Sequence, residues 1–229
     1  MGYALLAHCF ASPDAAAIER IRDIGASSQS ALGSSVLAPL AAAAAGATRE
    51  DLEEQYASLF TLSSSPDCPT FETAFISTDH LQQTNRMADI AGFYRAFGVD
   101  TGGNGFRPDE LSVELEFVAF LCQKQAYAAE HLGAPRVKQT LRAERLFLRE
   151  HLARWGGPLG RRVAMRASGH AFYAALGSAL HDWLDEECSR LAVGPVEMVD
   201  EPRMEWEDPN AASASEDEPF SDPVSVAAI

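Results

Sequence analysis

Apolar residues recur at helical spacing along most of this chain, and this periodicity restricts the possible folds more than any other feature. One stripe, at spacing i, i+4, i+7 and i+8, is formed by Leu52, Tyr56, Leu59 and Phe60. Such spacing places the apolar side chains on one face of a helix. Thr48 predicts the start of this helix, because Asp51 follows three residues later in a box-like arrangement. No alternating strand pattern competes strongly with helical spacing in the body of the chain.

Four further helices are predicted in the second half of the body. The first runs from about Asp79 to Phe97 and ends at Gly98, and the second opens at Pro108 and Asp109. The third begins at Pro135 and is expected to end at the Gly-Gly-Pro sequence of residues 156–158, and the fourth covers about 159–191. The alanine-rich N-terminal fifth is also predicted to be helical. Together these elements predict an all-α fold, with a single compact helical bundle over residues 1–194.

The composition changes after Gly194. Residues 195–229 carry ten acidic groups, one arginine and five prolines, and they contain few large apolar side chains. Repeated prolines prevent a continuous helix, and a segment with so little apolar surface has little to bury. The sequence therefore predicts an acidic, proline-rich flexible tail over residues 195–229.

The charge and the cysteines restrict the function. The net charge is −15 and no patch rich in Lys and Arg stands out, which argues against a nucleic-acid partner. The four cysteines, Cys9, Cys68, Cys122 and Cys188, are far apart, and no secretory signal or membrane-spanning run is visible. This pattern suits reduced thiols, so a cytoplasmic protein is expected.

The motifs of common enzyme classes are absent from the sequence. It has no phosphate-binding loop, no GxGxxG, no GxSxG nucleophile elbow and no HExxH zinc motif. Isolated histidines are more often surface or satisfied core residues than metal ligands, so no cofactor, no metal and no catalytic residue is expected. An enzyme with a dispersed site stays open as an alternative. It would be indicated by a closed pocket with hydrogen-bonded titratable groups, such as Glu72 with His80 or His151.

The segment from Arg107 to Phe117 carries the most information about function. Asp109 follows Pro108 where a helix is predicted to begin, so its carboxylate is expected to cap the free N–H groups there. Glu110 and Glu114 are four residues apart and are expected to share a face. Two interpretations stay open: a capped helix with a solvated acidic side, or an acidic rim beside an apolar groove that fits a basic and hydrophobic peptide.

Four segments, taken together in order and spacing, resemble the TorD/DmsD/NarJ family of chaperones for molybdenum-containing redox enzymes. Residues 53–60 are similar to the family's Tyr-x-x-Leu-Phe helix, and residues 69–73 to its Pro-x-Tyr-Glu element, with Phe71 in place of Tyr. Residues 87–98 are similar to the helix ending in Phe-Tyr-x-x-Phe-Gly. Residues 107–117 are similar to the Pro-Asp-His element, with Glu110 where the family usually has His.

The resemblance implies a TorD-like helical bundle that is not an enzyme. It also implies a cytoplasmic protein that binds the catalytic subunit of a DMSO-reductase-type molybdoenzyme, including its twin-arginine signal, during cofactor insertion and before export. A general helical adaptor with an unrelated partner is the main alternative. The residues expected to bind the partner are Glu72, Tyr94, Phe97, Arg107, Pro108, Asp109, Glu110 and Glu114.

Overall fold

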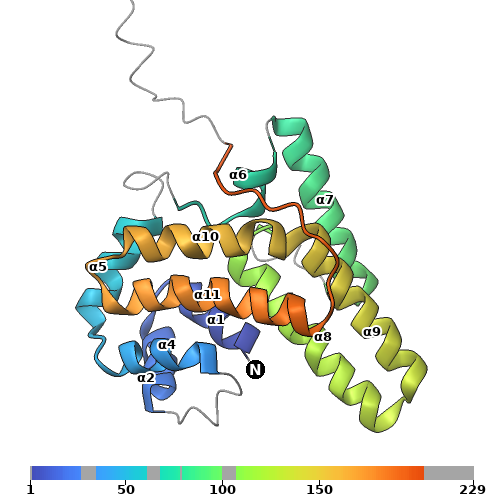
Figure 1. Cartoon of the computed structure of the whole chain (residues 1–229), viewed down its shortest axis with the longest axis horizontal. Coiled ribbons are helices and arrows are strands. Elements are labelled where there is room, and N and C mark those ends of the chain that lie inside the picture. The colour runs from blue at the N-terminus through green and yellow to red at the C-terminus, as the bar shows by residue number, and fades with distance from the viewer. Residues whose placement is uncertain (1, 27–34, 61–67, 78, 100–106, 204–229) are drawn as a thin grey trace, which may run out of the picture.

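The computed structural model describes residues 2–26, 35–60, 68–77, 79–99 and 107–203, and within these ranges every regular element is a helix (Figure 1). This confirms the all-α expectation. The N-terminal helices are α1 (Gly2–Phe10), α2 (Ala15–Ala26), η1 (Ser35–Leu37), α4 (Ala38–Ala45) and α5 (Arg49–Phe60). The remaining helices are α6 (Glu72–Ile76), α7 (His80–Ala96), α8 (Leu111–His131), α9 (Ala134–Phe147), η2 (Leu148–Leu152), α10 (Ala153–Arg166) and α11 (Ala171–Arg190).

Local sequence signals set two of the helix ends as predicted. The Asp51 N–H donates to the Thr48 side-chain oxygen over 3.2 Å, so Thr48 caps α5. At the end of α7, Gly98 adopts a positive φ of 76°, a conformation that costs glycine little and other residues more. The serine- and proline-rich stretch after Phe60 and the glycine-rich loop after α7 lie outside the described residues for most of their length.

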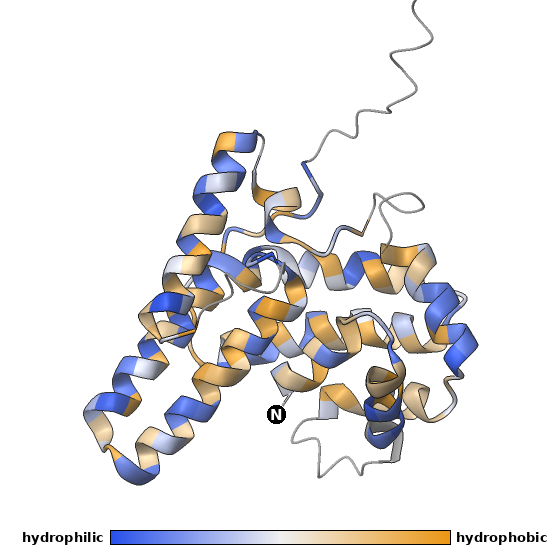
Figure 2. Cartoon of the chain, turned by 180° about the vertical axis from the view of Figure 1, so that it is seen from behind, coloured by the Kyte–Doolittle hydropathy of each residue, from blue (hydrophilic) through white to orange (hydrophobic). Residues whose placement is uncertain are grey.

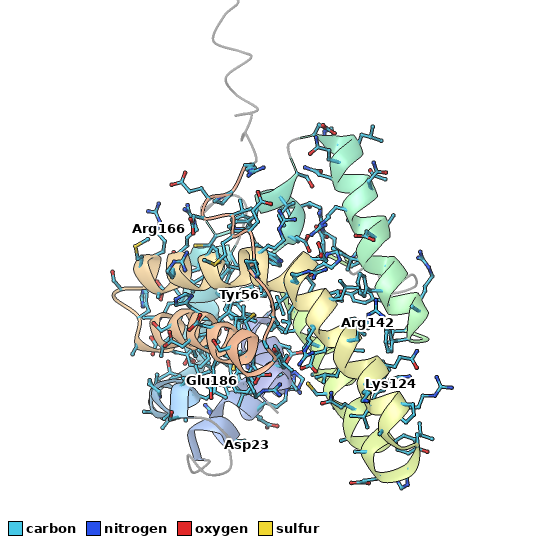
Figure 3. All side chains as sticks on the ribbon, turned by 45° about the vertical axis from the view of Figure 1, so that its right-hand side comes forward. Asp23, Tyr56, Lys124, Arg142, Arg166 and Glu186 are labelled. Carbon is cyan, nitrogen blue, oxygen red and sulfur yellow. The ribbon has the colours of Figure 1, made fainter. Side chains whose placement is uncertain are left out.

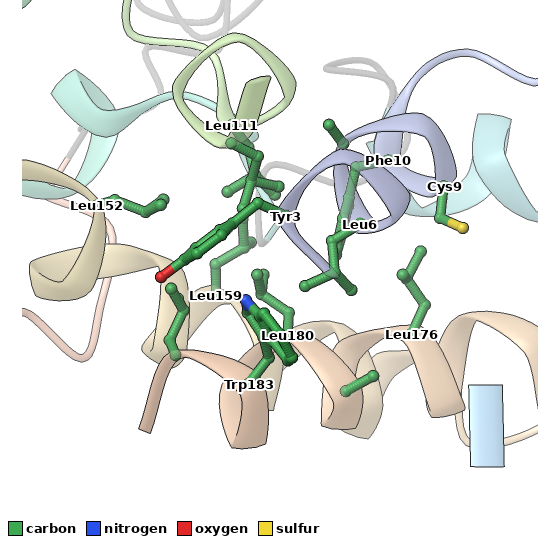
Figure 4. Packing of buried hydrophobic residues seen from close by; sticks show 14 of the residues in the cluster. Tyr3, Leu6, Cys9, Phe10, Leu111, Leu152, Leu159, Leu176, Leu180 and Trp183 are labelled. Atoms are coloured by element: carbon green, nitrogen blue, oxygen red, sulfur yellow. The ribbon is translucent and has the colours of Figure 1, made fainter. Parts of the chain in front are cut away.

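The core forms around the pair α10 and α11, which make the most extensive helix–helix contact and lie side by side in Figure 1. α1 packs across this pair and against α8, and Figure 4 shows its Tyr3, Leu6 and Phe10 among the buried side chains of α10 and α11. The Tyr3 ring meets the edge of Trp183, with the ring centres 5.5 Å apart. Figure 2 shows hydrophilic and hydrophobic residues interleaved along the helices, as expected for helices with one buried face. None of the helices within the described ranges combines the length and the apolar character needed to cross a membrane.

The helix predicted to end at residues 156–158 instead continues to Arg166. α9 passes through the π-helical turn η2 into α10, and Pro158 lies inside α10. Proline lacks the N–H that would bond to the carbonyl four residues earlier. That carbonyl, on Arg154, accepts a hydrogen bond of 2.8 Å from the backbone N–H of Val199 instead. A distant segment therefore supplies the donor that proline lacks.

The fourth predicted helix, over residues 159–191, is two helices. A tight turn at residues 167–170 separates α10 from α11, and the His170 N–H donates to the Ala167 carbonyl over 2.8 Å. His170 is exposed and directly precedes α11. The turn lets α11 fold back against α10.

The first part of the predicted tail lies against the helical body, which corrects the expectation that the chain leaves the body at Gly194. Val199 is buried, and its N–H bonds to α10 as described above. The Arg203 N–H donates to the Ala74 carbonyl of α6 over 2.7 Å, and Arg161 pairs with Asp200 at 2.6 Å. Residues 195–203, here named the strap, therefore join α10 to α6 (Figure 1). The rest of the predicted tail, residues 204–229, lies outside the described residues.

Candidate functional site

Two of the motifs identified in the sequence meet at one place, although 36 residues separate them. The Glu72 N–H donates to the Asp109 carbonyl and the Leu111 N–H donates to the Thr70 carbonyl, each over 2.8 Å. Phe71 and Glu110 form an isolated antiparallel bridge between these two bonds. We name residues 70–73 and 107–111 the junction. It fixes the position of α6 relative to the start of α8.

Asp109 holds the junction together from inside. Its side chain is fully buried, and one carboxylate oxygen accepts from the Thr73 N–H at 3.2 Å and from the Thr73 hydroxyl at 2.6 Å. The Arg107 guanidinium donates to both oxygens of the same carboxylate at 3.0 Å. Asp109 was expected to cap the helix that follows it, but it caps the N-terminus of α6 instead. The residue preceding α8 is Glu110, which makes no side-chain cap there.

Tyr94 connects α7 to the junction. Its hydroxyl donates to the Pro108 carbonyl over 2.7 Å, and its ring packs on Phe117 of α8 with the centres 4.6 Å apart. Burial, together with nearby carboxylates of which Glu114 is the first, raises the pKa of Tyr94 well above its ordinary value, so the hydroxyl stays a donor. Phe97 lies one turn further on and also packs on Phe117. Of the two predicted aromatic residues, Tyr94 therefore contacts the junction directly, and Phe97 packs on Phe117 of α8.

Glu72 is the centre of a buried polar cluster beneath the junction. Its carboxylate pairs with Arg86 of α7 and lies 3.2 Å from Nδ1 of His151 in η2. Arg86 also donates to the backbone carbonyl of Glu150 in η2. The predicted dispersed-site signature is thus partly present, since Glu72 meets His151, whereas His80 is exposed. Both Glu72 and His151 are fully buried, so the pair does not face an open pocket.

Glu114 is a further buried carboxyl group of this cluster. Burial, followed by the charge of Glu72 and a hydrogen bond with it, raises the pKa of Glu114 well above its ordinary value. Trp155 donates to Oε2 of Glu114 over 3.3 Å. The other oxygen, Oε1, has no partner of normal geometry among the described residues, and an ionised oxygen in that position would be costly. The geometry and the pKa shift therefore both favour a protonated carboxyl at Glu114.

The variant Glu114→Gln is expected to reduce the dependence of stability on pH. Because the pKa is raised in the folded state, that state holds a proton that the unfolded state loses, so the parent loses stability as pH rises above the ordinary pKa. This contribution has a slope of up to about 1.4 kcal/mol per pH unit. Glutamine stays neutral, so the variant should match the parent near about pH 4 and exceed it near about pH 8. Urea unfolding across this range measures the effect, with Glu116→Gln, an exposed residue of the same helix, as the control. The same pH slope in parent and variant would show that Glu114 is ionised in the fold.

Three of the four carboxylates expected to bind the partner do not lie at the surface, so they do not form an acidic rim. Glu72, Asp109 and Glu114 are fully buried, and only Glu110 is partly accessible. Glu110 precedes the first helical residue with an extended backbone, so it does not share a helix face with Glu114. Glu114 lies instead on the inner face, between Leu111 and Val118. Burial and the charge of Asp109 raise the pKa of Glu110, and Arg107 opposes this shift.

An apolar cleft of about 210 Å³ lies between the end of α7 and α8, next to the junction. It is lined by Tyr94, Val99, Val113, Glu116, Phe117 and Phe120. The Lys124 ammonium lies 5.0 Å from the centre of the Phe120 ring at its margin. Val113 and Phe120 were not among the residues expected to bind the partner, although they are seven residues apart and so share a helix face. That spacing was the available signal for a second apolar stripe on α8.

In the part of the chain that the structure describes, no group of three or more His, Cys, Asp or Glu side chains is placed to hold a metal ion. No disulfide joins the cysteines that the structure describes. The arrangement consists of an apolar cleft and of a junction that Tyr94 connects to it. At the junction, buried hydrogen bonds support a partly accessible carboxylate and a half-exposed guanidinium. Such a surface suits recognition of another polypeptide.

Comparison with known proteins gives a consistent set of similarities. Residues 29–160 match the family model described as the nitrate reductase delta subunit. The chain is 38% identical over 107 residues to the perchlorate reductase assembly chaperone protein of Dechloromonas aromatica (strain RCB), covering 44% of this chain and 46% of that relative. It is 29% identical over 191 residues to the selenate reductase assembly chaperone protein of Thauera selenatis, covering 83% of this chain and 88% of that relative.

One solved structure has a similar fold. It is from Archaeoglobus fulgidus and is described as that of a redox enzyme maturation protein. The TM-score is 0.51 at 20% sequence identity, and the match covers 80% of this chain and 91% of that one. At this identity the likeness concerns the fold alone.

Proposed function

The chain belongs to the family of the nitrate reductase delta subunit, and from this premise we propose that it is an assembly chaperone for a molybdenum-containing reductase. Its client is the catalytic subunit of a DMSO-reductase-type enzyme. It holds that subunit in the cytoplasm while the molybdenum cofactor is inserted and before export. The role is binding and not catalysis, and two relatives that are named assembly chaperones support this proposal.

The observation that carries the proposal is the junction. The Pro-x-Phe-Glu and Pro-Asp-Glu elements resemble family motifs, and the fold brings them together with Tyr94 beside an apolar cleft. Arg107 lies over the Phe71 ring at 4.4 Å, and 45% of its side chain is exposed. Arg107 and Glu110 thus present a cation and a carboxylate at the surface, and the buried groups beneath keep them in position.

The predicted site residues divide into two roles under this proposal. Glu110, Arg107 and Phe97 are the accessible groups that contact the client. Glu72, Pro108, Asp109 and Glu114 position those groups through the junction and the buried cluster. Tyr94 serves both roles, since its hydroxyl bonds to Pro108 while its ring lines the cleft.

The client segment that best fits this surface is basic and apolar, as in a twin-arginine signal. The apolar part occupies the cleft and supplies most of the affinity, and an arginine of the signal pairs with Glu110. A shielded charge-assisted hydrogen bond contributes about 1.5–3 kcal/mol, whereas an exposed pair contributes about 0–1 kcal/mol. Because Glu110 is partly buried, its pair should fall between these limits. Glutamate in place of the family's usual histidine would then favour a cationic client segment.

Copurification from the native host tests the function directly. The tagged chain should retain the catalytic subunit of a molybdenum enzyme, identified by mass spectrometry. A general helical adaptor would retain an unrelated partner, and this outcome would reject the chaperone proposal. A variant with a disrupted cleft, Phe120→Glu, should lose the client while its circular dichroism stays helical.

The variant Glu110→Gln is expected to weaken binding of a twin-arginine peptide about fivefold at low salt, corresponding to a loss of about 1 kcal/mol. The difference should shrink as salt screens the charge. Calorimetry at two salt concentrations measures it, with Glu130→Gln at the far end of α8 as a matched control. Equal affinities of parent and Glu110→Gln at both concentrations would show that Glu110 does not contact the peptide.

A further inference from the structure

A stripe of positive charge runs along α9 and η2, although the chain as a whole is strongly acidic. Lys138, Arg142, Arg145 and Arg149 are spaced i, i+4, i+7 and i+11, so they lie on one helix face, and all four are exposed. We name these four residues the basic stripe, and Figure 3 labels Arg142 on it. The only acidic residue of α9 is Glu144, which is buried on the opposite side. The stripe therefore carries four positive charges with little compensation from its own helix.

The C-terminal part of the basic stripe, from Arg142 to Arg149, borders a cavity of about 260 Å³. Arg142, Arg145, Leu146 and Arg149 form one side, and the turn at residues 192–194 forms the other. Arg149 also pairs with Glu150. Among the described residues, no carboxylate forms an ion pair with Lys138 or Arg142. The cavity thus offers guanidinium groups beside a backbone turn, which suits an anionic segment of polypeptide.

The chain itself contains a segment of matching charge. Residues 204–229 have no Lys or Arg and seven carboxylates, which are Glu205, Glu207, Asp208, Glu216, Asp217, Glu218 and Asp222. The strap follows Gly194, which borders the basic stripe, and ends at Arg203, immediately before this segment. Nine residues span at most about 32 Å, so the segment starts within that distance of the stripe. Twenty-six residues span at most about 94 Å, so the segment is long enough to reach the stripe.

We propose that the acidic segment 204–229 binds the basic stripe of its own chain. The link through the strap keeps the local concentration of carboxylates near the stripe high, at about the millimolar level. Exposed pairs are individually weak, so the association depends on several charges and should fade with salt. This inference does not depend on the identity of the client, and it accounts for a cationic face on a protein of net charge −15.

Carbodiimide cross-linking is a direct test, because the whole chain contains only two lysines, Lys124 and Lys138. Lys138 belongs to the stripe, whereas Lys124 lies on α8 above Phe97 and Phe120 and serves as an internal control. The reagent joins a lysine amine to a carboxylate in contact with it. Peptide mass spectrometry of the full chain should find bonds from Lys138 to residues 204–229 at least fivefold more often than from Lys124. Raising the salt to about 0.5 M should remove this preference.

The triple variant Arg142→Gln, Arg145→Gln, Arg149→Gln keeps Lys138 but removes three charges, and it should lose the preference. The matched control Arg20→Gln, Arg22→Gln, Arg95→Gln removes the same charge from exposed positions on α2 and α7. This control should keep the preference for cross-links from Lys138. Equal yields from Lys138 and Lys124 in the parent would overturn the proposal. So would a Lys138 preference that persists in the stripe variant, since the contact would then not depend on the stripe. Helical circular dichroism of both variants checks that they fold.

Discussion

Replacing Asp109 with alanine should lower the free energy of unfolding by about 3 kcal/mol, near the lower limit for breaking a buried charged pair. The variant loses the acceptor for the Thr73 N–H, the Thr73 hydroxyl and Arg107 together. The buried Thr73 N–H would be left without its side-chain acceptor, and an unsatisfied buried donor is destabilising. Loss of a surface ion pair alone would have a much smaller effect on stability. The effect stays at the lower limit because Arg107 is 45% exposed and can turn to water. Urea unfolding followed by circular dichroism measures it.

The neighbouring residue provides the control for Asp109→Ala. Glu110→Ala removes a carboxylate that is partly accessible and caps neither helix, so it should cost less than about 1 kcal/mol. Asp109→Asn retains the shape and one acceptor oxygen and should fall between the two. If the free energy of unfolding of Asp109→Ala lies within about 1 kcal/mol of the parent value, the junction does not depend on this carboxylate.

Adding one methyl group at Gly177 is expected to destabilise the fold by about 3 kcal/mol, because it forces two helices apart. A Cβ atom there would lie 2.5 Å from the Ala164 backbone nitrogen and 2.5 Å from the Gly160 carbonyl oxygen, both in α10. Backbone atoms cannot turn aside as a side chain can, so α10 and α11 would have to separate. For a domain of this size, such a loss lowers Tm by about 2–4 °C per kcal/mol.

Gly92→Ala is the matched control for Gly177→Ala. It makes the same change within α7, where nothing lies within 4 Å of the added atom. Alanine is favoured over glycine inside a helix, so this variant should be stabilised by about 0.5–1 kcal/mol. Thermal unfolding should move the two variants in opposite directions. A Gly177→Ala protein as stable as the parent would mean that the crossing of α10 and α11 is looser than described.

The sequence determined the features that depend on neighbouring residues. Helical spacing determined the fold class, the Thr48 cap started α5 and Gly98 ended α7, because each of these acts within one or two turns. The resemblance in motif order indicated the family that the comparisons show, and it singled out the residues that form the junction. Local patterns are sufficient when the partner of a group lies a few residues away.

Tertiary structure decided the features in which the partner is distant. The Arg154 carbonyl, which Pro158 leaves without a helical donor, accepts a hydrogen bond from Val199, and Asp109 caps α6 because the chain returns 36 residues later. The same reason explains why three carboxylates expected at the surface are buried: Trp155, His151 and Thr73 supply their hydrogen bonds from other helices. Tertiary structure likewise buries Glu144 on the opposite side of α9, which leaves the positive charge of the basic stripe without an acidic neighbour on the exposed face of that helix. The type of a buried polar residue determines which hydrogen-bond partners it requires, but the fold determines which distant groups supply them.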